Sequence, residues 1–296
     1  MTDMNLDGLR AWGGLAGQPL EGADVVIAGI PYDGSAVYRK GAALAPMRLR
    51  QLSAVMPPVT EDARPLAGLK VHDLGDIDAG PDIEAGWPSV AERLATVPAT
   101  ALLTVLGGDH CTAIATLAAQ ARRHPDLAVL WVDAHPDLCD FSRGGRWTCG
   151  CAMRRALEVS SIGPARVVIA GGRDYDPEEL EFIRTRGMLL VSASELAGDS
   201  GSARMVADAL DGKSLHVSFD IDALDPAYAP GTEIPSAGGL STRQALDFLR
   251  IATAGSKLVG LDIVEVSPPF DHGDITTLAA LKVIFELWGL FWHGKR

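Results

Sequence analysis

Carboxylate and imidazole side chains gather at the end of the most apolar stretch of the sequence. Residues 128–138 read AVLWVDAHPDL, so a β-branched run is followed by Asp133, His135 and Asp137 at alternate positions. The apolar part is typical of a strand that is buried on both faces of a parallel sheet. Unpaired charge at the end of such a strand is very costly, and a bound cation would remove that cost. The pattern therefore predicts metal coordination.

Two further apolar runs end in residues of the same chemical types. Residues 101–110 end in Gly-Gly-Asp-His, which places His110 just past a strand, and SFDIDALDP places Asp220 and Asp222 at another strand end. Taken singly, the histidine is better explained as a hydrogen-bonded loop residue and the aspartates as helix caps or turn formers. Taken jointly, the three groups can converge, because alternate residues of a strand point the same way.

The combined set contains four carboxylates and two imidazoles. Four carboxylates in one place need about four positive charges, which two divalent cations supply. Oxygen-rich sites with some imidazole suit Mn²⁺ better than the metals that prefer thiolates. We therefore expect two Mn²⁺ ions, with Ni²⁺ and Co²⁺ as alternatives, bound by His110, Asp133, His135, Asp137, Asp220 and Asp222.

Eight apolar runs must position these residues. They cover residues 24–30, 71–77, 101–108, 127–135, 165–172, 188–195, 215–224 and 257–266. Amphipathic helix candidates between them include residues 112–123, 154–159, 177–186, 203–210 and 242–254. Strands that alternate with helices predict an α/β fold with a mostly parallel sheet and helices on both faces. Such sheets bind ligands at the carboxyl ends of their strands, where the candidate metal ligands fall.

Composition narrows the classes of function. The chain has 296 residues, of which 47% are hydrophobic, and no linker divides it, so we expect one domain over residues 1–296 with residues 1–22 as a peripheral N-terminal arm. The formal net charge of −12 argues against nucleic-acid and anionic-membrane binding. We see no secretory signal and no apolar run near the roughly 20 residues of a membrane span. Four cysteines in a chain of this length make no disulfide scaffold, so we expect a cytoplasmic location.

The motifs together resemble those of the ureohydrolase superfamily, which contains arginases, agmatinases and related enzymes. The motifs are GGDH (107–110), DAHPD (133–137) and SFDIDALDPAYAPG (218–231), and the segments at 29–46 and 261–280 look agmatinase-like. The resemblance extends over nearly the whole chain. It implies the arginase-type three-layer α/β/α fold with an eight-stranded, mostly parallel sheet, in agreement with the eight runs. It also implies a homotrimer or homohexamer.

Carried onto this sequence, the resemblance implies a binuclear Mn²⁺ centre and a hydrolytic mechanism. The first ion would be bound by His110, Asp133, Asp137 and Asp220, and the second by His135, Asp133, Asp220 and Asp222. A hydroxide between the ions would attack the central carbon of a guanidinium group, and Asp137 would pass its proton to the leaving nitrogen. Glu265 matches the family's guanidinium-orienting glutamate, a role that suits a carboxylate.

One departure from the family pattern concerns the catalytic residues. The His-Gly pair of arginases and agmatinases, whose histidine is assigned to proton shuttling, is replaced by Cys149-Gly. A thiol has an ordinary pKa near 8.5 and forms only weak hydrogen bonds, so it would carry protons less readily at neutral pH than the imidazole of histidine. We weigh two interpretations equally: a shifted substrate or leaving group, as in formiminoglutamase-like members, and an exchange without functional consequence.

Substrate-binding positions also mix family features. Asp176, in an arginase-like segment, matches the acid that contacts the α-amino group of an amino-acid substrate. Arg143 and Arg146 lie on the loop that leaves the central motif and are candidates for binding a substrate carboxylate. Glu233 stands where the family usually has glycine, which predicts a reshaped loop.

We therefore expect a Mn²⁺-dependent hydrolase that releases urea from agmatine or a related guanidino compound, a guanidino acid included. The alternative on the same fold is a formiminoglutamase-like amidine hydrolase. A third interpretation, a non-catalytic subunit, is disfavoured because no metal ligand is missing. The single-zinc deacetylases of related fold are disfavoured because they use fewer carboxylates.

Overall fold

The computed structural model describes residues 10–198 and 200–295 of the chain. Its centre is one eight-stranded sheet with the strand order β2-β1-β3-β8-β7-β4-β5-β6, and every paired strand is parallel to its neighbour. The strands are β1 (Val25–Gly29), β2 (Val71–Asp76), β3 (Leu102–Leu106), β4 (Ala128–Val132), β5 (Val167–Gly172), β6 (Leu189–Ser192), β7 (Ser214–Asp220) and β8 (Lys257–Val264). The predicted eight-stranded parallel sheet is thereby confirmed.

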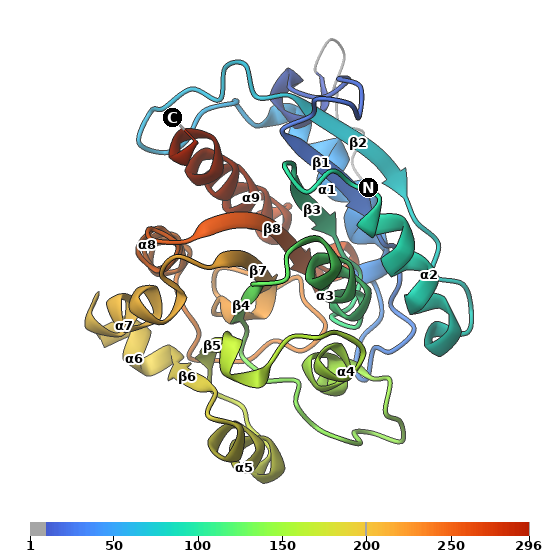
Figure 1. Cartoon of the computed structure of the whole chain (residues 1–296), viewed down its shortest axis with the longest axis vertical. Coiled ribbons are helices and arrows are strands. Elements are labelled where there is room, and N and C mark those ends of the chain that lie inside the picture. Colours follow the sequence, from blue (N-terminus) through green and yellow to red (C-terminus); the bar gives the residue numbers. More distant parts are fainter. Residues whose placement is uncertain (1–9, 199, 296) are drawn as a thin grey trace.

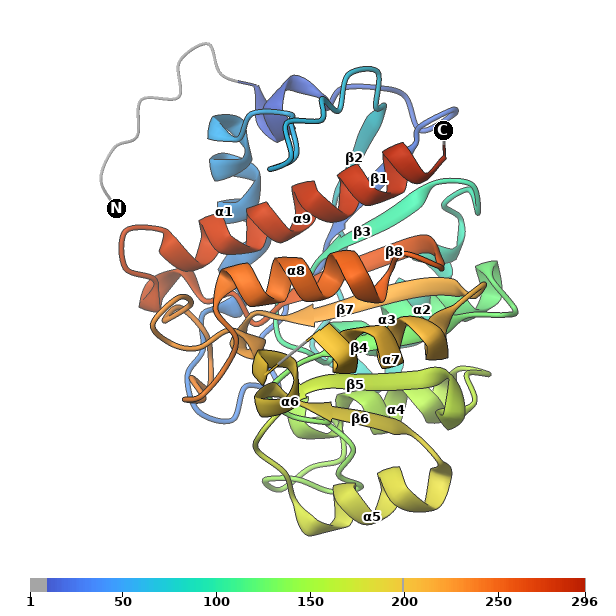
Figure 2. The same cartoon turned by 90° about the vertical axis from the view of Figure 1, so that its left-hand side faces the viewer.

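Helices cover both faces of the sheet and make it a three-layer α/β/α structure (Figures 1 and 2). One face carries α1 (Ala45–Leu52), α6 (Ala193–Gly198), α7 (Ser200–Leu210), α8 (Thr242–Ala252) and α9 (Ile275–Gly294). The other carries α2 (Ile83–Ala95), α3 (Thr112–Arg123), α4 (Ala152–Val159) and α5 (Pro177–Arg186). Strand side chains alternate between two cores, since Leu130 packs in the first and Trp131 in the second.

Helix α9 corrects the expectation about long apolar segments. Over its 20 residues it is long and apolar enough, by length and composition, to cross a membrane. In the structure 61% of its most apolar window is buried against the sheet and the neighbouring helices. A helix that is apolar on nearly all sides is typical of a core position, and this one fills the middle of the first layer.

The N-terminal segment contributes to the core instead of lying wholly on the surface. Residues 1–9 of the predicted arm lie outside the described part of the chain. Trp12 is fully buried, its ring 5.4 Å from that of Trp288 in α9, and its Nε1 donates to Asp73 Oδ2 over 3.2 Å. Burial of a tryptophan contributes a large apolar area to the fold, so this part of the arm closes the first core.

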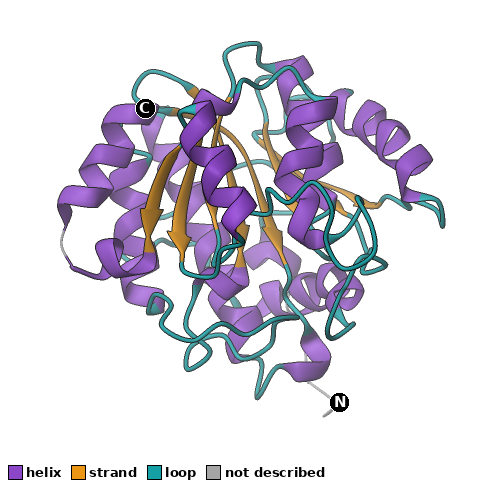
Figure 3. Cartoon of the chain, turned by 90° about the horizontal axis from the view of Figure 1, so that it is seen from below, coloured by secondary structure: helices purple, strands orange, loops and turns teal. Residues whose placement is uncertain are grey.

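The strand ends define the functional edge of the molecule. Because all paired strands are parallel, their carboxyl ends lie at one edge of the sheet, and loops gather beyond the arrowheads that are visible in Figure 3. The loops after β3, β8, β7 and β4 meet there because these are the four central strands, and the loop after β1 joins them because β1 pairs with β3. Loops on a rigid scaffold are the usual place for binding and catalysis.

Candidate metal centre and substrate cavity

His110 is positioned by a tight turn between β3 and α3. A side chain at Gly108 would place its Cβ 1.7 Å from the Tyr32 carbonyl oxygen, so the turn requires glycine. The carboxylate of Asp109 accepts hydrogen bonds from the N–H and hydroxyl of Ser35 over 3.0 and 2.6 Å, which joins this turn to the loop after β1. The His110 ring stacks on Trp131, with 3.8 Å between centroids. These contacts fix the imidazole toward the sheet edge.

The central motif lies on a loop, and not on the strand as the alternating pattern suggested. Strand β4 ends at Val132, and the chain then coils so that Asp137 has a left-handed φ of +54°. The N–H of His135 donates to Asp133 Oδ1 over 2.7 Å, which closes a short turn. The three side chains therefore converge through loop geometry, which a run of straight strand would not provide.

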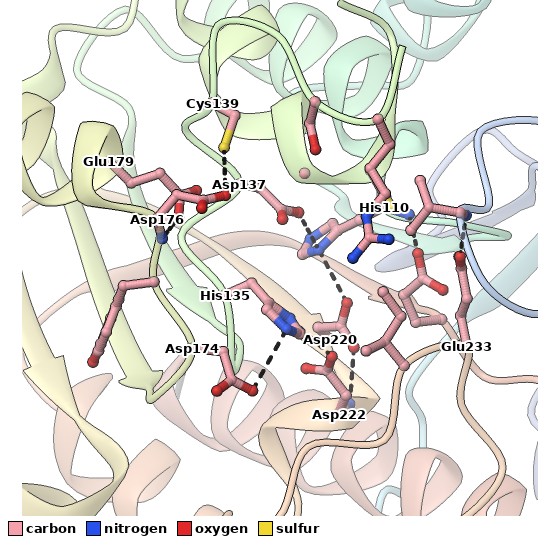
Figure 4. A pocket seen from close by; sticks show the side chains of 18 residues that line it. His110, His135, Asp137, Cys139, Asp174, Asp176, Glu179, Asp220, Asp222 and Glu233 are labelled. Carbon is pink, nitrogen blue, oxygen red and sulfur yellow. Dashed lines mark hydrogen bonds and ion pairs between the residues drawn. The ribbon is translucent and has the colours of Figure 1, made fainter. Parts of the chain in front are cut away.

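All six predicted ligands meet at this edge, and Figure 4 shows five of them, His110, His135, Asp137, Asp220 and Asp222. Three carboxylates surround His110 Nδ1, with Asp133 Oδ2 at 2.9 Å, Asp220 Oδ2 at 3.1 Å and Asp137 Oδ2 at 3.3 Å. The second histidine, His135, faces Asp222 Oδ2 at 3.1 Å and Asp133 Oδ1 at 3.5 Å through its Nδ1. Asp133 belongs to both groups. The contacts form two overlapping groups, His110 with Asp133, Asp137 and Asp220, and His135 with Asp133 and Asp222, so Asp220 is found beside His110 alone.

The donor set fits divalent cations. Two ligand atoms about 2.1 Å from one ion are about 3 Å apart when they meet at a right angle, which is close to the separations around His110 Nδ1. His110 Nδ1 and Asp133 Oδ2 are buried and accept or donate no hydrogen bond. Buried polar atoms normally have a partner, so these atoms are available as metal ligands. Oxygen and nitrogen donors without thiolate suit Mn²⁺ and similar ions.

The charges of the cluster are unbalanced without a cation. Burial, and then the neighbouring Asp133, raise the pKa of Asp137 to about 8. Burial and the charges of Asp222 and Asp133 raise the pKa of Asp220 well above its usual range. Burial acts to lower the pKa of His110, but its carboxylate partners outweigh burial and raise it. Carboxyl groups that resist ionisation together are the electrostatic signature of a site that needs positive charge.

A buried polar chain holds His110 from behind, and the sequence reasoning missed it. His110 Nε2 lies 3.0 Å from Ser218 Oγ, which donates to Asp262 Oδ1 over 2.5 Å. The second oxygen of Asp262 lies 2.7 Å from His216 Nε2, whose Nδ1 is 3.1 Å from Gln120 Nε2. The signal was present, because polar residues occupy alternate positions 216, 218 and 220 of the buried strand β7. Such outer partners orient metal-binding histidines.

His135 has a weaker outer partner. Its Nε2 lies 3.9 Å from Asp174 Oδ2, and that carboxylate accepts a hydrogen bond from Ser236 Oγ over 2.5 Å. The Asp174 side chain is more than half exposed, so solvent screens its effect on the imidazole. The two histidines are thus held with unequal rigidity, His110 by a buried chain and His135 at the open side.

Glu265, Cys149 and Glu233 form a second group beside the metal centre. Their ligand-type atoms lie within 4.8 Å of one another, and all three side chains are buried. Glu265 has a left-handed φ of +62°, and its Oε1 accepts a hydrogen bond from the His110 N–H over 2.8 Å. Burial, followed by Glu265 and Asp137, raises the pKa of the Cys149 thiol, so the thiol is neutral at neutral pH.

A cavity of about 290 Å³ opens onto both groups. Among the other predicted substrate-binding residues, Asp176 and Arg143 line this cavity. Asp176 is held by its neighbours, since its N–H donates to Glu179 Oε2 over 2.8 Å and its Oδ2 accepts from Cys139 Sγ over 3.3 Å. Arg146 is not among the lining residues, and its Nη2 is 3.0 Å from Asp140 Oδ1. The structure therefore brings Asp176 and Arg143 to the site and directs Arg146 elsewhere.

Comparison with known proteins gives the family. The family model described as Arginase family matches residues 23–289. Proclavaminate amidinohydrolase of Streptomyces clavuligerus is 37% identical, over 90% of this chain and 87% of that protein. Its solved structure has a TM-score of 0.87 at 34% identity and covers 98% of this chain and 99% of that one. The mitochondrial guanidino acid hydrolase of Homo sapiens is 34% identical over 90% and 78% of the two chains. The agmatinase of Bacillus anthracis is 33% identical over 90% and 91%.

The chain belongs to the arginase family, and the predicted ureohydrolase relationship with agmatinase-like members is confirmed. It is accordingly a hydrolase that acts on guanidino or amidine C–N bonds. The roles of individual site residues, the homo-oligomeric state and the cytoplasmic location stay predictions.

Proposed function

We propose that the protein is a hydrolase with two Mn²⁺ ions per subunit that releases urea from a guanidino acid. The observation that carries this proposal is the cavity, whose lining includes the buried Glu265, Arg143 and five of the six candidate metal ligands, all except Asp133. A substrate with a cationic head group and an anionic tail would meet opposite charges at both positions.

Glu265 supports the guanidinium part of this proposal. One of its oxygens, Oε1, is held by the His110 N–H, and the other, Oε2, is buried without a hydrogen-bond partner. A free carboxylate oxygen next to the metal ligands is what a guanidinium N–H group would complete. The left-handed backbone of Glu265 supports a functional role, because strained residues are retained where the surrounding structure requires that geometry.

Arg143 supports the carboxylate part. Of the described residues that line the cavity, Arg143 is the one arginine, and no lysine accompanies it. An arginine can bind a carboxylate with two parallel hydrogen bonds, whereas it would repel the amine of agmatine. The names of two relatives agree with an acidic substrate, since one is a guanidino acid hydrolase and the other acts on proclavaminate. We therefore favour a guanidino acid over agmatine.

The cavity residues would have separate roles in hydrolysis. When bound, the two cations supply an acidified water molecule and neutralise the four carboxylates. Glu265 orients the head group, and Asp137 transfers a proton to the leaving nitrogen. The position of Asp137 supports this assignment, since its carboxyl group belongs to the ligand cluster and the residue also lines the cavity. Cys149 lines the cavity as a neutral thiol and leaves the head group free of a competing positive charge.

A substrate panel tests the proposal. Mn²⁺-loaded protein is incubated with 4-guanidinobutyrate, 3-guanidinopropionate, arginine, agmatine and formiminoglutamate, and urea and formamide are measured. We expect urea, with a guanidino acid as the best substrate. Asp133→Asn should remove activity and bound metal together, whereas the matched control Asp126→Asn, an exposed residue in the turn before β4, should keep both. Urea from none of the guanidino compounds would refute the proposal.

The same panel tests the second candidate, an amidine hydrolase of the formiminoglutamase type. The observation that favours this candidate is Cys149 at a position where arginases and agmatinases have histidine. Formamide from formiminoglutamate, without urea from any guanidino compound, would establish it in place of the first proposal.

A further inference from the structure

Two buried glutamates from different loops face each other at the inner end of the cavity. Glu233 follows β7 and is 2% exposed, and Glu265 follows β8 and is 4% exposed. Both line the cavity, and their carboxyl groups lie with Cys149 Sγ inside a 4.8 Å cluster. A carboxylate this deeply buried is rare unless it has a partner.

Each glutamate uses one oxygen for the protein and leaves the other free. Glu233 Oε1 accepts hydrogen bonds from the N–H groups of Val37 and of Tyr38, the latter over 2.9 Å. Glu265 Oε1 accepts from the His110 N–H over 2.8 Å. The remaining Oε2 atom of each residue is buried and has no hydrogen-bond partner. The main chain thus fixes both carboxyl groups and leaves two acceptors unused.

No protein cation completes this pair among the described residues. Arg39, on the loop after β1, is directed at the main chain, because its Nη2 donates to the Thr232 carbonyl over 2.6 Å and its Nε to the Glu233 carbonyl over 3.1 Å. Its guanidinium group also lies over the Phe270 ring, 4.3 Å from the centroid. Cys149 is a neutral thiol and cannot balance two carboxylates. A bound cationic group with N–H donors would balance this pair and complete both unused oxygens.

We infer that Glu233 is a second carboxylate for the substrate's cationic head group and that it acts together with Glu265. A guanidinium or amidinium group is planar and carries N–H donors on more than one edge, so two carboxylates from different loops can each accept from it. This inference rests on the proposed function and deepens it. It makes the site selective for protonated head groups with unsubstituted nitrogens over neutral or fully alkylated ones.

The loop contacts of Glu233 make this role a matter of fixed geometry. The N–H groups of Val37 and Tyr38 hold its carboxylate. Arg39 donates to the carbonyl oxygens of Thr232 and of Glu233 itself. A group that is held before the substrate arrives loses little entropy on binding, which increases affinity. The same contacts explain why the loop after β7 accepts a charged side chain at a buried position.

Glu233→Gln tests the inference, because glutamine keeps an oxygen for the N–H groups of Val37 and Tyr38 and removes the charge. The matched control is Glu195→Gln, since Glu195 also accepts a backbone N–H, that of Ser192 over 2.8 Å, but does not line the cavity. On Mn²⁺-loaded protein we would measure KM for the best substrate and inhibition constants for guanidinium chloride and for urea, its neutral isostere. Metal content and melting temperature are measured on the same samples.

We expect Glu233→Gln to raise KM and the guanidinium inhibition constant about 10- to 100-fold and to change the urea constant less than about threefold, because one hydrogen-bonded charge is lost. Glu195→Gln should leave all three values unchanged. Glu233→Asp, which keeps the charge but shortens the side chain, should fall between wild type and Glu233→Gln and serves if glutamine prevents folding.

Three results would overturn the inference: unchanged guanidinium inhibition in Glu233→Gln, equal weakening of guanidinium and urea, or the loss of one bound Mn²⁺ per subunit, which would make Glu233 a metal ligand. Failure of the proposed function is a separate outcome. If the wild type hydrolyses nothing in the panel, calorimetric binding of guanidinium to wild type and to Glu233→Gln still decides the role of Glu233.

Discussion

The serine behind His110 offers the sharpest test of how the fold prepares the metal centre. Ser218 Oγ is fully buried and lies between His110 Nε2 and Asp262 Oδ1. Because its hydroxyl proton is directed at the Asp262 carboxylate, its oxygen accepts from the N–H at His110 Nε2. That bond leaves the Nδ1 lone pair for a cation, so the serine selects the tautomer of the metal ligand.

We predict that Ser218→Ala weakens Mn²⁺ binding about 10- to 100-fold, which is about 1.4–2.8 kcal/mol. The estimate agrees with the cost of leaving one buried polar group unsatisfied, about 1–3 kcal/mol. Ser218→Ala should also lower the melting temperature of metal-free protein, since the variant leaves Asp262 Oδ1 and His110 Nε2 unpaired.

The assay is a competition titration of metal-stripped protein with Mn²⁺ and a chelating indicator. Ser214→Ala is the matched control, because Ser214 begins the same strand and its Oγ bonds to Asp126 Oδ2 over 3.1 Å, at the opposite end of β7. The control should bind Mn²⁺ as the wild type does. Mn²⁺ affinity within about twofold of wild type in Ser218→Ala would refute the reasoning that this serine orients His110.

Three further predictions concern substrate and stability. Cys149→His places an imidazole beside the paired glutamates, where its positive charge competes with a cationic substrate, so we expect a KM about tenfold higher and a changed substrate ranking; steady-state kinetics that match the wild type would mean the exchange has no consequence. Arg143→Ala should raise KM for guanidino acids about tenfold but not for agmatine, with Arg146→Ala as the silent control; an equal effect on both substrates would argue against carboxylate binding. Two arginines of α8 lower the pKa of Glu61 from 4.5 to about 2, so its stabilising effect is complete above about pH 4.5 and is lost as the pH falls toward 2. The lowered pKa corresponds to about 3 kcal/mol of stabilisation, and solvent screening reduces this, so Glu61→Gln should lower the free energy of unfolding by about 1–2 kcal/mol at neutral pH. Denaturant titrations of variant and wild type should show a smaller difference in the free energy of unfolding at about pH 3. A difference that does not change with pH would contradict the assignment.

Most of the scaffold could be predicted from the sequence because its signals are local. Each strand is a short apolar run followed by a loop, and parallel pairing places the carboxyl ends of such runs on one edge. The residue types of the six candidate ligands are equally local, since charged groups after buried strands need partners wherever the strands lie. Helix α9 escaped prediction because it is apolar on nearly all sides and therefore lacks an amphipathic pattern.

The sequence by itself determined the sheet, the family and the residue types of the candidate metal ligands. Only the tertiary structure decided which residues contact these ligands and which residues lie next to them in the cavity. The order β3-β8-β7-β4 sets Ser218 against His110 across 108 positions of sequence and lets Glu265 accept the His110 N–H across 155. The fold also brings Glu233 close to Cys149 and Glu265. In the sequence, Glu233 was notable only because the family usually has glycine at that position. The physical reason is that residue type fixes which groups need a partner, whereas strand order and loop conformation fix which partner each one meets.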